Sequence, residues 1–168
     1  MARVVAVSGA SGKTGYRIAE ELLAVGIHPR LLLRSESAVP ASLTPCEQVR
    51  LNIENVDALD QALVGAEALV IATGARPSID LSGPMRVDAW GVKRQIESCQ
   101  RVNVNRVVLV SSLCAGRWRH PLNLFGLILV CKRIGERALE RSGLAWTVIR
   151  PGGPVSYTHL TLPTTRWG

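Results

Sequence analysis

The chain has 168 residues, of which 47% are hydrophobic, 20% charged and 4% aromatic. This length suits one domain with a sizeable core, and the composition is too apolar for a disordered chain. The formal net charge is +7, and the basic residues, mostly arginine, are scattered along the sequence. Scattered charge indicates a solvated surface, so we expect no nucleic-acid partner.

The cysteine spacing and the hydropathy exclude further classes of protein. Cys46, Cys99, Cys114 and Cys131 form no CxxC pair, which predicts neither a disulfide framework nor a metal site. The sequence enters an apolar run at once, so we expect no signal peptide. The longest apolar run, residues 124–131, is far shorter than the roughly 20 residues that span a bilayer. These features predict a cytoplasmic protein without a transmembrane segment.

Short apolar runs alternate with segments of helical periodicity. An apolar run indicates a strand buried on both faces, whereas apolar residues three and four apart indicate an amphipathic helix. Six strands alternating with helices predict an α/β fold with a doubly wound parallel sheet, the Rossmann fold, whose ligands bind at the carboxyl edge of the strands. We expect strands at residues 3–7, 31–33, 49–53, 68–72, 106–110 and 146–149, and helices at 15–25, 56–64, 87–102 and 127–141.

The pattern stops near residue 154. We assign residues 1–154 to one Rossmann domain that is incomplete at its C-terminus, and we expect the natural protein to continue beyond Gly153. The segment VSYTHLTLPT, residues 155–164, resembles the translation of a sequencing-library transposon adapter. We therefore interpret residues 155–168 as a non-native tail, the alternative being an ordinary polar C-terminal strand.

A glycine-rich turn joins the first strand to the first helix. Its glycines, Gly9, Gly12 and Gly15, follow the pattern G-x-x-G-x-x-G. One glycine allows a tight turn, one lets the backbone approach a pyrophosphate, and one packs the helix on the sheet. The helix N-terminus then offers free N–H groups and the positive end of its dipole. The pattern favours a dinucleotide site over a purely structural turn, and the residues expected to bind are Gly9, Ser11, Gly12, Lys13, Thr14 and Gly15.

The same segment contains Gly12-Lys13-Thr14, which is also how the phosphate loop of nucleoside triphosphatases ends. That loop, G-x-x-x-x-G-K-T, requires its first glycine where this chain has Val7, inside the expected strand. We therefore expect Lys13 and Thr14 to face a pyrophosphate and not a magnesium ion.

The second strand ends in Arg34, nineteen positions after Gly15. A site that prefers NAD places an acidic residue there, to hold the ribose hydroxyls. An arginine instead favours a 2′-phosphate, through its charge and bidentate geometry. The sequence predicts NADP as the cofactor in preference to NAD, while an ordinary surface arginine is the alternative interpretation of Arg34.

These residues resemble the atypical short-chain dehydrogenase/reductase family, in its NmrA-like branch. The resemblance covers about residues 3–153, and residues 122–153 are especially similar to the NADP-binding subunit of the chloroplast inner-envelope translocon and its cyanobacterial relatives. The motifs that carry it are GASGKTG at 9–15, LLLRS at 31–35, LNIEN at 51–55, VDAWG at 87–91, LVSS at 109–112, HPLN at 120–123 and VIRPGG at 148–153.

The resemblance implies further roles around a bound dinucleotide. Asn52, which replaces a common aspartate, and Ile53 would flank the adenine. The implied contacts of the ribose and nicotinamide are Ala72, Thr73 and Gly74 on the cofactor ribose, Ser111 and Ser112 near the nicotinamide, Pro151 and Gly152 beside its amide, and Lys132 on the nicotinamide ribose.

One departure from the family affects catalysis. The family pair is Tyr-x-x-x-Lys, in which the lysine and the cofactor lower the tyrosine pKa so that it can exchange a proton. Four residues before Lys132 this chain has Ile128, which has no proton to donate. We therefore expect an NADP(H)-binding, redox-responsive binding or assembly factor, with a protein partner in photosynthetic assembly and a plastid location if the source is a photosynthetic eukaryote. The alternative is an NADP-dependent oxidoreductase or isomerase that acts on a small carbonyl substrate through Ser111, Ser112 and Lys132.

Four other side chains have two interpretations each. His120 could replace the missing proton donor or be a turn residue, and Cys131 could be a redox thiol or a small apolar packing residue. Arg117 and Arg119 either form a basic edge near the cofactor or solvate a loop. The tryptophans Trp90, Trp118 and Trp146 are interpreted as packing residues.

Overall fold

The computed structural model describes residues 3–74, 83, 85–113, 115, 117 and 128–151. Gly152, the expected tail at 155–168, and Cys114, Trp118, Arg119 and His120 lie outside these residues. The described elements are β1 (Val4–Ser8), α1 (Lys13–Ala24), β2 (His28–Leu33), the 3₁₀ helix η1 (Ala41–Leu43), β3 (Glu47–Arg50), α2 (Val56–Leu63), β4 (Ala68–Ile71), the π-helix η2 (Met85–Gly91), α3 (Val92–Arg101), β5 (Arg106–Val110), α4 (Ile128–Glu140) and β6 (Ala145–Ile149).

The strands form one parallel sheet in the order β3-β2-β1-β4-β5-β6. The chain moves outward from β1 to β3 and then returns to the other side of β1, where it adds β4, β5 and β6. The order therefore reverses between β1 and β4, the position at which such sheets bind ligands. The predicted doubly wound α/β sheet is confirmed.

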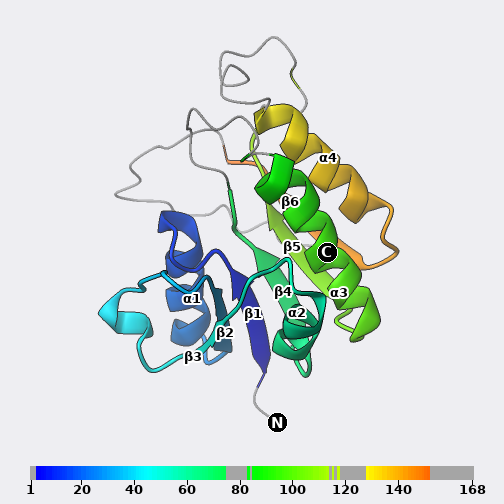
Figure 1. Ribbon diagram of the computed structural model, residues 1–168. Coiled ribbons are helices and arrows are strands. Elements are labelled where there is room, and N and C mark those ends of the chain that lie inside the picture. Colours follow the sequence, from blue (N-terminus) through cyan, green and yellow to red (C-terminus); the bar gives the residue numbers. More distant parts are fainter. Residues whose placement is uncertain are drawn as a thin grey trace, which may run out of the picture.

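Each face of the sheet has its own core. Alternate residues of one strand point to opposite faces, so Val5 and Val7 belong to one core and Ala6 to the other. The first core joins the strands to α1 and η1 and includes Leu31, Leu33, Ala19 and Leu43. The second joins them to α2, α3 and α4 and includes Leu32, Leu69, Leu109, Leu59, Ile96 and Leu139. Figure 1 shows α3 and α4 side by side over the half of the sheet that contains β5 and β6.

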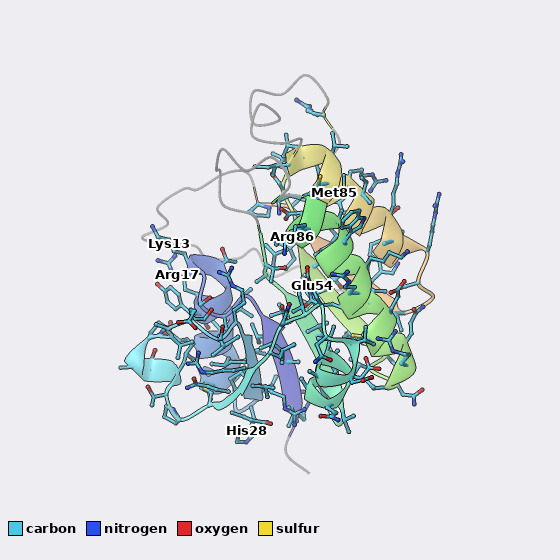
Figure 2. All side chains as sticks on the ribbon, viewed as in Figure 1. Lys13, Arg17, His28, Glu54, Met85 and Arg86 are labelled. Atoms are coloured by element: carbon cyan, nitrogen blue, oxygen red, sulfur yellow. The ribbon has the colours of Figure 1, made fainter. Side chains whose placement is uncertain are left out.

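The direction of the strands fixes where a ligand can lie. In Figure 1, β1 runs upward from the amino terminus, so the carboxyl edge of the parallel sheet is at the top. Figure 2 places Lys13, the first residue of α1, near that edge and His28, the first residue of β2, at the opposite end. The glycine turn therefore lies at the ligand-binding edge, as the sequence predicts.

Some expected boundaries and packing roles differ from the structure. β3 ends at Arg50, because Asn52 to Asn55 form a turn that leads into α2. The helix expected at 87–102 is a π-helix that continues into α3. Trp90 is 56% exposed and Trp146 47%, so their interpretation as packing residues is wrong. Trp146 lies on an edge strand of the described sheet, and Trp90 follows the buried Asp88 and Ala89 on the outer side of η2.

A glycine sets the distance between α4 and η2. A Cβ added at Gly135 would lie 2.6 Å from the carbonyl oxygen of Asp88 and 3.3 Å from the side chain of Val92. Real Cβ atoms do not approach backbone oxygen that closely, so only glycine permits this spacing. The contact places one turn of α4 directly against the helix that carries Asp88.

We predict that Gly135→Ala lowers the free energy of unfolding by about 1–3 kcal/mol, the usual cost of overpacking. Alanine is intrinsically the better helix former by about 1 kcal/mol. A lower free energy of unfolding would therefore mean that the clash with Asp88 outweighs the gain in helix propensity. Urea denaturation of the two proteins measures the difference. Arg137→Ala, on the exposed side of the same helix, is the control and should not destabilise the chain. A stabilised Gly135→Ala variant would show that α4 does not pack this closely.

Candidate functional site

The glycine turn brings the ends of β1 and β4 into backbone contact. Gly9 has a φ of +88°, and a Cβ there would lie 2.7 Å from the carbonyl carbon of Ala72 and 2.8 Å from the nitrogen of Thr73. A Cβ on Gly15 would lie 2.2 Å from the carbonyl oxygen of Gly9. Both positions therefore exclude every residue but glycine, for conformational reasons at Gly9 and steric reasons at both. The turn is closed by a hydrogen bond of 2.9 Å from the Gly12 N–H to the Gly9 carbonyl.

The first turn of α1 leaves its N–H groups available to a ligand. Gly12 is the N-cap residue and has no side chain to accept from them, and no acidic residue lies in the first turn. The positive end of the helix dipole and the adjacent exposed Lys13 are therefore not neutralised within this turn. Together with a backbone cradle that any Cβ would fill, this arrangement fits the pyrophosphate of a dinucleotide.

A cavity of about 500 Å³ continues from this turn toward the end of β2. Its lining residues are Ser11, Arg34, Ser35, Glu36, Ser37 and Ala38. The structure thus brings the predicted residues Ser11 and Arg34 to one cavity, beside the glycine turn. Glu36 was missed by the sequence reasoning, which considered only the residue at the end of the strand. Its carboxylate would oppose an added phosphate, whereas Arg34 would attract one.

The turn after β3 holds the two residues expected near adenine. Asn52 uses its side-chain oxygen to accept the Glu54 N–H at 3.0 Å, so that atom is engaged within the turn. Ile53 packs against η2, where its Cδ1 would lie 3.1 Å from a Cβ on Gly91. Figure 2 shows Glu54 beside Arg86, and their ion pair of 3.3 Å links this turn to η2. Ile53 is therefore held at a fixed place on the carboxyl side of β3.

A buried ion pair lies at the end of β4. Lys132 Nζ donates to Asp88 Oδ1 at 2.7 Å, and the two side chains are 16% and 2% exposed. Lys132 Nζ is also 3.7 Å, and Asp88 Oδ1 3.9 Å, from the place of a Cβ on Gly74. The structure thus brings Lys132 and Gly74 together, and Gly74 follows Ala72 and Thr73 directly. The hydroxyl of Thr73 is buried without a hydrogen-bond partner in the described part of the chain.

The helix turn that precedes Lys132, residues 128–131, is apolar. Ile128, one turn earlier, is 8% exposed and supplies no proton donor at the family's tyrosine position. Cys131 is 1% exposed, and burial, reinforced by the Asp88 charge, raises the pKa of its thiol. A raised pKa disfavours the reactive thiolate, which favours the packing interpretation of Cys131 over the redox one.

A second charged cluster ties α4 to the ends of β5 and β6. Glu136 is fully buried and accepts from Arg150 at 2.9 and 3.0 Å and from Arg133 at 2.8 Å. Burial works to raise the pKa of Glu136, but Arg150, the Ser111 hydroxyl and Arg133 outweigh it and lower the pKa to about 2. Ser111 is 6% exposed, and among the described residues its Oγ forms no well-aligned hydrogen bond.

Three groups of predicted residues result. Gly9, Ser11, Gly12, Gly15 and Arg34 lie around the turn and its cavity, with Ala72 and Thr73 against Gly9. Gly74 and Lys132 form the second group, with Asp88. Ser111 and Pro151 lie at the neighbouring ends of β5 and β6, where the Leu113 N–H donates to the Pro151 carbonyl, and Ser112 follows Ser111. Asp88 was missed as a site residue, although it is the aspartate of the VDAWG motif.

These features define a dinucleotide-binding Rossmann domain. Residues 9–159 match the family described as NAD(P)H-binding, and the chain belongs to this family. Among its relatives, an uncharacterised chloroplast protein of Arabidopsis thaliana is 36% identical over 89% of this chain and 58% of that protein. The chloroplast protein TIC 62 of Pisum sativum is 31% identical over 89% of this chain and 32% of that protein. The predicted resemblance to atypical short-chain dehydrogenases/reductases is confirmed.

A solved structure supports the same assignment. A putative NAD-dependent epimerase/dehydratase from Bacillus halodurans is 30% identical, with a TM-score of 0.78 over 90% of this chain and 71% of that one. The chain spans about a third to three fifths of the length of the two chloroplast relatives. Within the described residues, no helix has the length and hydropathy to cross a membrane, and no cluster of His, Cys, Asp or Glu could hold a metal ion.

The Glu136 cluster predicts a specific acid sensitivity. Since folding lowers the pKa of Glu136 from 4.5 to about 2, its contribution to stability is complete above pH 4.5 and is lost as the pH falls toward 2. Denaturation at a series of pH values should show a shallower acid loss for Glu136→Gln than for the unmodified chain. Glu140→Gln, which removes the outer carboxylate of the same Arg133, is the control and should keep the steeper loss. Equal slopes for all three proteins would contradict the assignment.

Proposed function

We propose that this protein binds NADP(H) and works as a redox-responsive binding or assembly factor. The observation that carries the proposal is the combination of an intact backbone cradle at Gly9 and Gly15 with an apolar Ile128 where the family has its proton-donating tyrosine. A domain that retains the cofactor site and lacks the usual acid can respond to the cofactor without reducing a carbonyl. Its partner would then distinguish the oxidised from the reduced complex.

The preference for NADP rests on Arg34. Arg34 follows the last residue of β2 and lines the cavity that continues from the glycine turn. A 2′-phosphate bound there would meet a guanidinium, with the backbone of residues 35–38 around it. Glu36 in the same cavity works against the phosphate, so the selectivity depends on the balance of these two side chains.

The relatives motivate the proposed class of partner. Two of the most similar proteins are chloroplast proteins, and one of them is TIC 62. We therefore propose a partner among proteins that are assembled in photosynthetic membranes, and a plastid or cyanobacterial-type setting.

We predict that the full chain binds NADPH more tightly than NADH, and that Arg34→Ala weakens NADPH by about tenfold to a hundredfold with little effect on NADH. The estimate is that of one charge-assisted hydrogen-bonding contact. Isothermal titration calorimetry with both nucleotides gives the two dissociation constants. Failure of the chain to bind either nucleotide would end the proposal, and an equal loss for both would remove the phosphate role of Arg34.

Glu36 provides a matched variant of opposite charge. Glu36→Gln should shift the ratio of the two dissociation constants toward NADPH, because it removes a carboxylate from the same cavity. A shift in the same direction as that of Arg34→Ala would mean that the cavity does not receive the 2′-phosphate.

An enzyme remains the second candidate, favoured by the ion pair of Lys132 and Asp88 beside Gly74. A lysine held at this edge of the sheet can hydrogen-bond the ribose of a bound dinucleotide and move a proton through its ammonium group. Ser111, in contrast, is buried against Glu136, so a reaction would rely on Lys132 and Ser112. The Bacillus halodurans structure described as an epimerase/dehydratase supports this alternative.

We predict that the full chain shows no steady NADPH oxidation above background with a panel of small aldehydes and ketones. Absorbance of NADPH measures the rate, and a matched assay with Lys132→Met sets the background. NADPH oxidation that Lys132→Met abolishes, while NADPH binding persists, would favour the oxidoreductase over the binding factor.

A further inference from the structure

Arg50 fastens the turn that follows β2. It is the last residue of β3 and pairs in register with Leu33, so its side chain extends from the neighbouring strand. Its Nη1 lies 2.7 Å from the carbonyl oxygen of Ser35, 2.9 Å from that of Ser37 and 3.3 Å from that of Arg34. The turn is also closed by a hydrogen bond of 3.0 Å from the Ser37 N–H to the Arg34 carbonyl. One guanidinium nitrogen thus meets three of the four carbonyls between residues 34 and 37.

The direction of these carbonyls fixes the direction of the N–H groups. No described peptide bond is cis, and in a trans peptide the N–H points opposite to the C=O of the same unit. Because the carbonyls of residues 34, 35 and 37 converge on Arg50, the N–H groups of residues 35, 36 and 38 point away from it. Arg50 therefore fixes the orientation of the peptide units in this turn.

Arg50 does not itself line the cavity. Among the described residues, the lining consists of Ser11 and residues 34–38, and within this segment Arg50 holds the carbonyls of residues 34, 35 and 37. Arg50 instead borders a separate hollow of about 400 Å³ between β3 and α2. An effect of Arg50 on a ligand in the first cavity would therefore pass through the turn.

We propose that Arg50 is a positioning residue that determines selectivity for the 2′-phosphate, by fixing the turn at residues 34–37 so that Arg34 faces the cavity. This inference rests on the proposed NADP(H) binding. A guanidinium suits the task because it is rigid and always charged, so that Nη1 is held against several carbonyl oxygens at once. Arg34 supplies the positive charge that contacts the phosphate, and Arg50 fixes the conformation of the turn that carries Arg34.

The chain contains a matched control. Arg30, on β2, also donates through Nη1 to two backbone carbonyls, those of Ala62 at 3.1 Å and Val64 at 2.7 Å. It borders the same hollow as Arg50 but fastens the end of α2 and not the turn at 34–37. Both arginines contact backbone carbonyls and border one hollow, but they hold different segments, and Arg30 also pairs with Glu47 at 2.8 Å.

The experiment measures NADPH and NADH binding by calorimetry for the unmodified full chain, Arg50→Met, Arg50→Lys and Arg30→Met. We expect Arg50→Met to weaken NADPH binding about tenfold, the scale of one lost charge-assisted contact. NADH binding should weaken less than about twofold. Arg50→Lys keeps the charge without the planar group and should also lose selectivity. Arg30→Met should leave the ratio of the two dissociation constants unchanged. The ratio of the dissociation constants of 2′,5′-ADP and 5′-AMP should change with Arg50→Met in the same way.

A double variant distinguishes an effect of Arg50 through the turn from a direct effect of its charge. If Arg50 acts by presenting Arg34, Arg50→Met should have little further effect on selectivity in the Arg34→Ala chain. Equal losses for NADPH and NADH, additive losses in the double variant, or full selectivity in Arg50→Lys would each overturn the inference while leaving NADP binding intact. An unmodified chain without preference for NADPH would overturn both the NADP proposal and this inference.

Discussion

The close backbone contact between β1 and β4 is the constraint on which the site depends. Gly9 approaches the Ala72–Thr73 peptide to a distance that a Cβ would occupy, and Gly15 approaches Gly9 more closely still. These contacts place the start of α1 over the point between β1 and β4 where the strand order reverses. No side chain caps the first N–H groups of this helix. Any larger residue would push α1 outward and separate the phosphate-binding backbone from the end of β4. The residues expected along the rest of the dinucleotide are positioned relative to this contact.

Local sequence patterns were sufficient to predict most of the fold. Six apolar runs predicted six parallel strands, and the glycine spacing predicted which loop would lie at the carboxyl edge, because both signals are contained in short segments. Patterns failed where the environment decides burial. Trp90 and Trp146 are large apolar residues, and a periodicity argument assigns them to the core, yet their place on η2 and on an edge strand leaves about half of each exposed.

The site was predictable only where one segment contains the whole signal. Arg34 and the glycines could be found because strand, turn and helix follow one another in the sequence. Two ion pairs join residues that are far apart in the sequence: 44 positions for Asp88 with Lys132, and 14 for Glu136 with Arg150. These pairs depend on how closely α4 packs on η2 and on β6. Gly135 sets the first of these distances through a contact that no sequence period reveals. Arg50 was missed for a similar reason, since an exposed arginine at a strand end has no distinctive pattern.

The two charged clusters on α4 explain how the helix that carries Lys132 is held in place. Lys132 and Glu136 are one turn apart on the same helix, and each is neutralised by an oppositely charged residue from another element, Asp88 of η2 and Arg150 after β6. Asp88 and Glu136 are the buried partners, so removing the cation that pairs with either one is costly, because it leaves a charge in an apolar environment. These pairs therefore fix α4 against the ends of β4, β5 and β6 independently of residue 128. With its position secured in this way, the helix accommodates Ile128 in its packed face and still holds Lys132 beside Gly74.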